Sequence, residues 1–215
     1  MKQLDTLGIA RELEGIGTVK SVQNRLNVNR IRAIYLLHRL RKKGYVRTFY
    51  QSNKVRVYRI SPEYALGGTN YIEIINKYSP IKLAMFEIHQ IYGRKPSIEE
   101  TLVYALCKNS VRYVIASLSL FRKVRDWNLL YRLAKEKDIV REIAALYDIA
   151  RLYLPKLRKM PLRFNNSAIP KKSDRYKYII DGLRSDNFQS VENKWKVYIP
   201  LNAADLREYR GVFIS

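Results

Sequence analysis

The lysines and arginines are the residues of this chain whose type and spacing most clearly indicate a chemical role, the binding of anions. No acidic residue lies between Glu14 and Glu63, and the same stretch holds twelve lysines and arginines. Each cation that neutralises a phosphate releases a counterion, whereas each carboxylate opposes binding. An acid-free stretch therefore predicts a polyanionic partner, and the net charge of +22 over the whole chain points the same way. The alternative is that these cations only form a solvated face. That interpretation fits scattered basic residues better than an acid-free stretch that contains a folded motif.

Catalytic and metal-binding chemistry is not indicated. His38 and His89 are the only histidines, and Cys107 is the only cysteine. The sequence contains no phosphate-binding glycine loop and no zinc-binding cluster. Glu99 and Glu100 fit helix capping better than acid–base work, and Cys107 is expected to be buried or half-buried. We therefore expect no catalytic residue, no cofactor and no metal. The opposing hypothesis, a nucleic-acid-processing enzyme, lacks an evident general base.

Local signals in residues 1–62 predict three helices that would position the basic residues. An apolar repeat from Leu4 to Leu13 predicts the first helix, which the glycines at 15 and 17 would end. Thr18 is placed to cap a second helix, and Asn29 to cap a third. The third helix is expected to end at Gly44, where glycine tolerates left-handed backbone.

A hairpin is expected to follow the third helix. Residues 45–50 and 54–60 are rich in Val, Tyr and Phe, and the polar residues 51–53 separate them. Ser61-Pro62-Glu63 then indicates the start of a new helix or turn.

The stretch Leu26–Val46, LNVNRIRAIYLLHRLRKKGYV, resembles the turn, recognition helix and first wing strand of bacterial and archaeal winged-helix transcription factors. It departs from them at Asn27, where glycine is common, but asparagine also tolerates left-handed geometry. The resemblance implies a winged helix-turn-helix DNA-binding domain over residues 1–62. This domain would read duplex DNA with the helix 29–43 and the wing 45–60.

The resemblance also assigns expected roles on that domain. Ala33, Leu37 and Leu40 would face the core, and arginine and asparagine early in the third helix have base-reading chemistry. The cations later in that helix, on the second helix and in the wing suit phosphates. The expected DNA-binding residues are Lys20, Ser21, Asn29, Arg30, Arg32, Tyr35, Arg39, Lys42, Arg47, Lys54 and Arg56.

Ile31 and Ile34 fit neither the core nor the DNA-facing group. They could pack on the first helix or touch thymine methyl groups, and core packing is the interpretation we favour from the sequence.

The sequence pattern of the remaining residues predicts a helical domain over 63–160. A basic linker and a strand-containing segment over 161–215 follow, and this segment is expected to pack on the helical domain. The linker is expected at 157–177, and a strand at 194–202 with residues 176–180 as its partner. The fold class is mainly α with small β. The helices are expected at 81–92, 98–107, 111–123, 127–137 and 139–154.

The order of these later segments resembles the C-terminal domain of AbiEi-type antitoxins. The likeness lies in residues 97–106, in Asp126-Trp127 with Leu129-Leu130, and in a basic loop before Lys194-Trp195-Lys196-Val197. It implies an alternative function, an antitoxin that represses its own operon and counters a nucleotidyltransferase-like toxin.

Double-stranded DNA is the expected partner, and a homodimer or a toxin bound through the helical or C-terminal domain stays open. The nearly apolar stretch 114–121 is too short to span a bilayer, and the first residues lack a signal-peptide core. We therefore expect a cytoplasmic protein without a membrane partner.

Overall fold

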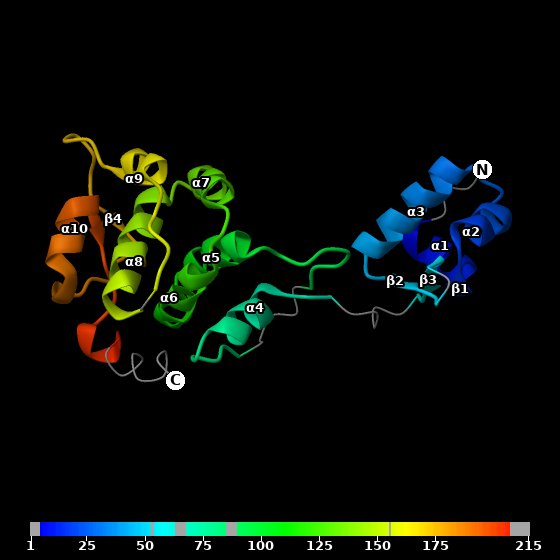
Figure 1. Cartoon of the computed structure of the whole chain (residues 1–215), viewed down its shortest axis with the longest axis horizontal. Helices are drawn as coiled ribbons and strands as arrows, with labels where there is room; N and C mark the ends of the chain where they lie inside the picture. Colours follow the sequence, from blue (N-terminus) through cyan, green and yellow to red (C-terminus); the bar gives the residue numbers. More distant parts are fainter. Residues whose placement is uncertain (1–4, 53, 63–67, 85–89, 155, 207–215) are drawn as a thin grey trace. The chain divides into compact units, whose positions relative to one another are not determined.

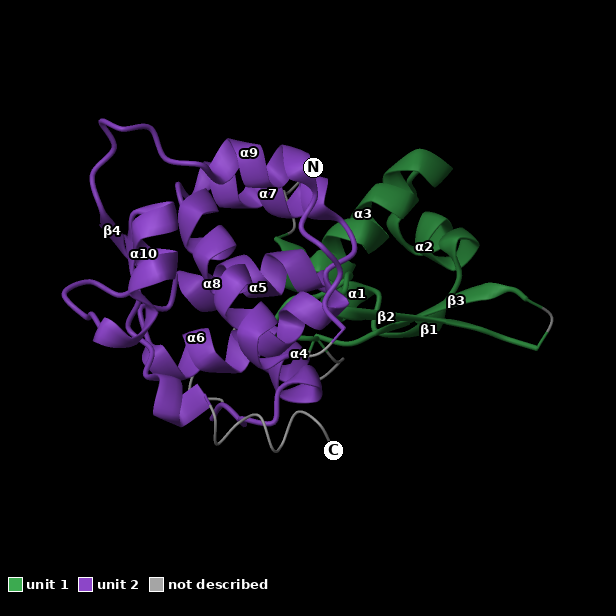
Figure 2. Cartoon of the chain, turned by 60° about the vertical axis from the view of Figure 1, so that its left-hand side comes forward, with its two compact units in different colours: residues 1–70, 88–95 green, residues 71–87, 96–215 purple. Residues whose placement is uncertain are grey.

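The computed structural model describes residues 5–52, 54–62, 68–84, 90–154 and 156–206, and in these ranges the chain is mainly helical with small sheets. The chain divides into two compact units (Figure 1). Unit 1 comprises Met1–Asn70 and Ile88–Lys95, and unit 2 comprises Tyr71–Glu87 and Pro96–Ser215 (Figure 2). The expected boundary between 62 and 63 differs from this division, in which unit 1 runs to Asn70 and takes in Ile88–Lys95. The C-terminal segment 161–215 shares one core with the helices of the segment 63–160, on which it was expected to pack.

Three helices form most of unit 1: α1 (Thr6–Glu12), α2 (Val19–Leu26) and α3 (Arg30–Lys42). The turn between α2 and α3 passes through Asn27, whose φ of 48° is left-handed as expected. The side chain of Asn29 then caps α3, again as expected. The three helices predicted from periodicity and capping are thus present.

The sheet of unit 1 has three antiparallel strands: β1 (Gly15–Gly17), β2 (Val46–Tyr50) and β3 (Arg56–Ile60), in the order β1-β3-β2. The hairpin β2–β3 confirms the expected pair of strands, and it extends beyond the helices of unit 1 in Figure 2. The strand β1 was not expected, since the glycines at 15 and 17 were interpreted only as a helix stop. Both β1 and β2 pair with Ile60 of the central strand, through Gly15 and Val46.

The core of unit 1 lies between the helices and the sheet. Ala33, Leu37 and Leu40 are buried there, which confirms the expected inward face of α3. The other buried members are Ile9, Ala10, Leu13, Val22, Leu36, Tyr45, Val46, Tyr58 and Ile60.

A short segment after α4 belongs to unit 1. The backbones of Thr69 and Ile91 exchange two hydrogen bonds of 2.8 and 3.1 Å. The ring of Tyr92 lies against Gly44, so close that a Cβ on Gly44 would be 2.8 Å from ring atoms. Gly44 follows the end of α3 with a φ of +86°, as glycine allows.

The expected helix over 81–92 is wrong. A helix that was not expected, α4 (Tyr71–Tyr78), instead precedes Ser79 and Pro80. The Ser79 N–H bonds to the carbonyl of Ile75 and closes α4, so the Ser-Pro pair ends a helix rather than opening one. Residues 81–84 and 90–92 are not helical, while Met85 and Ile88 of the expected helix lie outside the described residues. So does Glu63, at which a new element was expected.

Unit 2 contains the four later helices that were expected, with small changes at their ends. Residues 119–123 are a 3-10 turn rather than the end of an α-helix. Asp138 has a φ of 54° and does not cap α8, whose N-cap is Ile139. The helices are α5 (Ile98–Leu106), α6 (Val111–Leu118), η1 (Ser119–Lys123), α7 (Trp127–Glu136) and α8 (Val140–Tyr153).

The expected linker over 157–177 is wrong. Part of it forms α9 (Leu162–Ala168), whose Phe164 and Ala168 are buried in the core of unit 2. Two buried side chains in a polar, basic sequence are enough to dock a short helix.

The C-terminal β element is smaller than expected. The strands β4 (Lys177–Tyr178) and β5 (Val197–Tyr198) pair in parallel, so the expected partner segment is correct. Lys194 and Trp195, however, belong to α10 (Gln189–Trp195), which follows the 3-10 turn η2 (Asp186–Phe188).

Candidate nucleic-acid interface

The N-terminus of α2 is held by a reciprocal cap. The Ser21 N–H donates to Oγ1 of Thr18, and the Thr18 N–H donates to Oγ of Ser21 at 2.8 Å. The Ser21 hydroxyl also donates to the carbonyl of Thr18, so it is engaged within its own helix turn. Neighbouring Lys20 is exposed and is therefore the better-placed group for an anion at this end of α2.

The start of α3 is fixed in the same way. Oδ1 of Asn29 accepts the N–H of Arg32 at 2.8 Å. Bidentate contact with adenine needs both the oxygen and the NH₂ group of an asparagine side chain. Because the oxygen of Asn29 already holds the helix, capping is the role that the geometry supports for this residue.

The remaining expected cations of unit 1 are all exposed. Three of them have a described neighbour: Arg39 donates Nη2 to Oγ1 of Thr6 at 3.0 Å, and Arg32 and Arg56 lie over the rings of Tyr35 and Tyr58. These contacts orient the side chains without neutralising their charge. The exposed group comprises Lys20, Arg30, Arg32, Arg39, Lys42, Arg47, Lys54 and Arg56.

The face of α3 opposite the core carries apolar residues. At about 100° per residue, positions 31, 35, 38 and 42 point away from the buried positions 33, 37 and 40. Ile31 is 80% exposed, Tyr35 is 53% exposed and Ile34, at the edge of this face, is 47% exposed. The favoured expectation that Ile31 and Ile34 pack in the core is therefore wrong, because the core contacts use the other side of the helix.

The hairpin adds a second exposed surface that combines cations with aromatic rings. In the register of β2 and β3, Arg47 lies directly opposite Arg59 and Tyr50 lies opposite Arg56. Like charges at directly opposed positions destabilise a strand pair. Arg59 is exposed as well, and sequence reasoning did not assign it to the interface although it lies in the acid-free stretch.

Cys107 and His38 belong to different units, while the carboxylates of Asp138 and Glu142 meet at Lys177, whose Nζ lies 2.6 and 4.0 Å from their nearest oxygens. Cys107 is exposed, so the expected burial is wrong, and desolvation raises the pKa of its thiol. A raised pKa disfavours the reactive thiolate. His38 lies exposed on α3, and His89 is outside the described residues.

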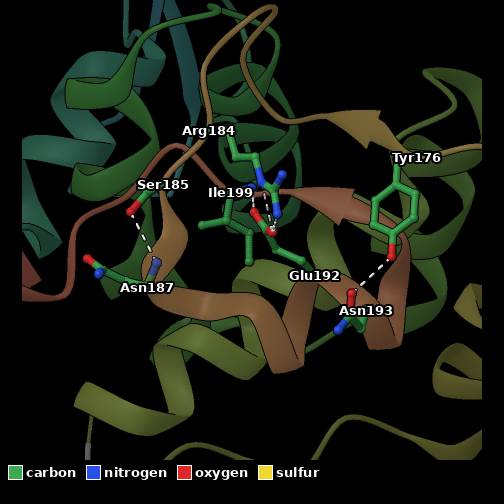
Figure 3. Close-up of polar contacts among 7 residues, drawn as sticks. All are labelled: Tyr176, Arg184, Ser185, Asn187, Glu192, Asn193 and Ile199. Carbon is green, nitrogen blue, oxygen red and sulfur yellow. Dashed lines mark hydrogen bonds and ion pairs between the residues drawn. The ribbon is translucent and has the colours of Figure 1, made fainter.

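Of the buried carboxylates in the described part of unit 2, Glu99 and Glu192 have hydrogen-bonded partners, whereas Oε2 of Glu142 accepts no hydrogen bond. Oε2 of Glu100 accepts the N–H of Ser97 at 2.9 Å, which confirms the expected cap of α5. Oε1 of Glu99 instead accepts the backbone N–H groups of Arg125 and Asp126 at 2.9 and 3.0 Å and holds the chain before α7. In Figure 3, Arg184 and Glu192 point toward each other, and their Nη2 and Oε2 atoms are 3.1 Å apart. Oε1 of Glu192 accepts the N–H of Ile199 at 2.8 Å. Both oxygens of Glu192 are engaged, so this carboxylate links the loop before η2 to the residue that follows β5.

Comparison of the chain with protein-family models, with curated proteins and with solved structures found no match. In the ranges that the structure describes, no helix is long and apolar enough to cross a membrane. Within the same ranges, no group of His, Cys, Asp and Glu side chains is arranged to hold a metal ion.

Proposed function

We propose that unit 1 is a winged helix-turn-helix domain that binds double-stranded DNA, and that the protein is a DNA-binding transcriptional regulator. In this proposal α3 enters the major groove and the hairpin β2–β3 is the wing beside it. The left-handed turn at Asn27, the capped start of α3 and the three-stranded sheet support this arrangement.

The observation that carries the proposal is the exposure of the cations from an acid-free stretch on one small folded unit. Within that unit, Arg47 and Arg59 even oppose each other across the hairpin, at a cost to the free protein. Phosphates placed along the hairpin would offset that repulsion, whereas water and salt screen it only in part.

Different cations are proposed for different parts of the duplex. Arg30 and Arg32 lie in the first turn of α3, where a guanidinium can donate two hydrogen bonds to a guanine. Lys20, Arg39 and Lys42 would contact phosphates, as would Arg47, Lys54 and Arg56 on the wing.

The test is duplex binding by the full-length protein, measured by fluorescence anisotropy. The probes are the DNA upstream of its own gene and a scrambled duplex of the same composition. We expect Arg30→Ala/Arg32→Ala to reduce affinity for the upstream DNA by at least tenfold, since a bidentate contact contributes about 1–3 kcal/mol of discrimination. We also expect the preference over the scrambled duplex to shrink.

A charge-matched control is available on α7 of unit 2. Arg132→Ala/Lys135→Ala removes the same two positive charges from exposed positions. Equal effects of the two double variants, or undiminished affinity and preference in a folded Arg30→Ala/Arg32→Ala protein, would reject the assignment.

A second candidate function is neutralisation of a toxin by unit 2. It is supported by three exposed apolar side chains near α8 and α9, Leu152, Leu162 and Ile169, which suit a protein partner. Co-expression with a toxin-like neighbouring gene should restore growth, and Leu162→Asp should weaken the rescue while Arg30→Ala/Arg32→Ala does not. Absence of rescue by the full-length protein would reject this function.

A further inference from the structure

The outward face of α3 carries isoleucines at the positions where a DNA-reading helix would present its base-contacting side chains. Resting on the function proposed above, we propose that Ile31 and Ile34 contact thymine C5-methyl groups, and that the protein prefers thymine at the base pairs these two side chains cover. Ile31 is 80% exposed and Ile34 is 47% exposed, so both are accessible in unit 1.

Charge around this face favours DNA over a protein partner. Arg30 flanks the isoleucines on one side of the helix, and Arg32 and Arg39 flank them on the other. A second copy of the chain packed α3 to α3 would bring these arginines against one another, because a twofold interface pairs the same patch with itself. A duplex instead supplies phosphates on both sides of the groove and apolar methyl groups at its floor.

The apolar chemistry of the outward face of α3 indicates which base it would prefer. Thymine is the base that presents an apolar group in the major groove, and an aliphatic side chain gains from covering it. Asn29, the other candidate for reading an A·T pair, has its Oδ1 bonded to Arg32. Methyl contact is therefore the route to A·T preference that these side chains leave open.

Replacing thymine by uracil tests this contact, because it removes the methyl group and retains the hydrogen-bonding edge. The probes are a duplex of alternating dA and dT, the same duplex with dU for dT, and one of alternating dG and dC. The full-length protein should bind the dT duplex about fourfold more tightly than the dU duplex for each covered methyl, which corresponds to ~0.8 kcal/mol. Binding to the dG–dC duplex reports the guanine contacts proposed for Arg30 and Arg32, so the methyl contact is judged from the dT and dU duplexes alone.

The variant Ile31→Ala/Ile34→Ala should bring the dT/dU affinity ratio close to one and leave dU binding almost unchanged. Both positions are exposed and alanine is a good helix former, so α3 should retain its helicity in circular dichroism. Ile16→Ala is the matched control, because Ile16 is 65% exposed in the same unit but lies on β1. That control should keep the wild-type ratio.

The outcomes separate this inference from the function on which it rests. If none of the three duplexes is bound, the proposed DNA-binding function fails. If all are bound and wild type does not distinguish dT from dU, or if the ratio survives Ile31→Ala/Ile34→Ala, the methyl contact is overturned and DNA binding stands. If that variant instead changes a dimer to a monomer in sedimentation and leaves the ratio intact, the face serves self-association and the inference is wrong.

Discussion

Replacing Gly44 by alanine should destabilise unit 1 through two separable effects. The φ of +86° is unfavourable for a residue with a Cβ, at a cost of about 1–2 kcal/mol. The new Cβ would also lie 2.8 Å from atoms of the Tyr92 ring, which must move. Overpacking of this kind costs about 1–3 kcal/mol, so we expect a total loss of about 2–5 kcal/mol.

Gly93→Ala is the matched control for the backbone effect. Gly93 also has a positive φ, +78°, but its nearest neighbour to a new Cβ is Nε of Arg41 at 3.4 Å. It should therefore lose about 1–2 kcal/mol, the backbone cost alone. In a Tyr92→Ala background, Gly44→Ala should fall to the same cost, because the opposing ring is gone.

Hydrogen exchange of the α3 amides and urea unfolding followed by circular dichroism would measure these losses in the full chain. Both tryptophans, Trp127 and Trp195, belong to unit 2, so their fluorescence reports that unit as an internal reference. A cost of Gly44→Ala no greater than that of Gly93→Ala would show that the Tyr92 ring does not oppose the new Cβ. An extra cost that persists in the Tyr92→Ala background would exclude the ring as its cause.

Three further predictions concern salt, pH and a buried indole. If ~6 cations contact phosphates, affinity for duplex DNA should fall about 10³-fold between about 50 and 200 mM salt in anisotropy titrations. Lys20→Ala should reduce the slope of log affinity against log salt concentration by about 0.9. A slope near zero would contradict the interface. Burial raises the pKa of Glu142, so the folded state keeps a proton that the unfolded state releases, and stability should fall as pH rises above about 4. In urea unfolding, the free energy of unfolding of Glu142→Gln should therefore rise relative to that of wild type between about pH 4 and 7. The opposite trend would count against burial as the cause of the raised pKa. Asp148→Ala should cost about 1–3 kcal/mol in the same assay, because it leaves the indole N–H of fully buried Trp195 without its acceptor, whereas Asp148→Asn should cost less.

Local signals predicted the elements whose determinants lie within a few residues. The caps at Thr18, Asn29 and Ser97 each act over three residues, so they are visible in the sequence and present in the structure. The same holds for the inward face of α3, which follows from helical periodicity.

Elements that depend on distant partners were missed. The strand β1 is a Gly-Ile-Gly segment with little strand preference, and it exists because it pairs with β3 more than 40 residues later. The helix α9 looks like a linker because only Phe164 and Ala168 anchor it. Ser79 and Pro80 were misassigned because a Ser-Pro pair is compatible with either end of a helix, and only the packing of α4 decides which.

The sequence predicted which cations belong to the candidate site, but it did not predict which other side chains share the exposed face of α3. The acid-free stretch identified the cations from the sequence alone. Residue type, by contrast, argued for burial of Ile31 and Ile34, and only the packing of the core against the other side of α3 exposes them. The engaged oxygens of Ser21 and Asn29 likewise depend on cap geometry that a residue list does not contain.

The return of residues 88–95 to unit 1 has a consequence for synthesis on the ribosome. Because unit 1 takes its last segment from beyond α4, it is incomplete when the first seventy residues emerge. The helix α4 emerges in between, and its Ile72 and Ile75 belong to the core that it shares with later helices of unit 2. Domains generally fold as units during translation, the N-terminal one first. In this chain, the whole core of unit 1 emerges before α4, whereas Tyr92, whose ring lies against Gly44, emerges only after that helix of the other unit.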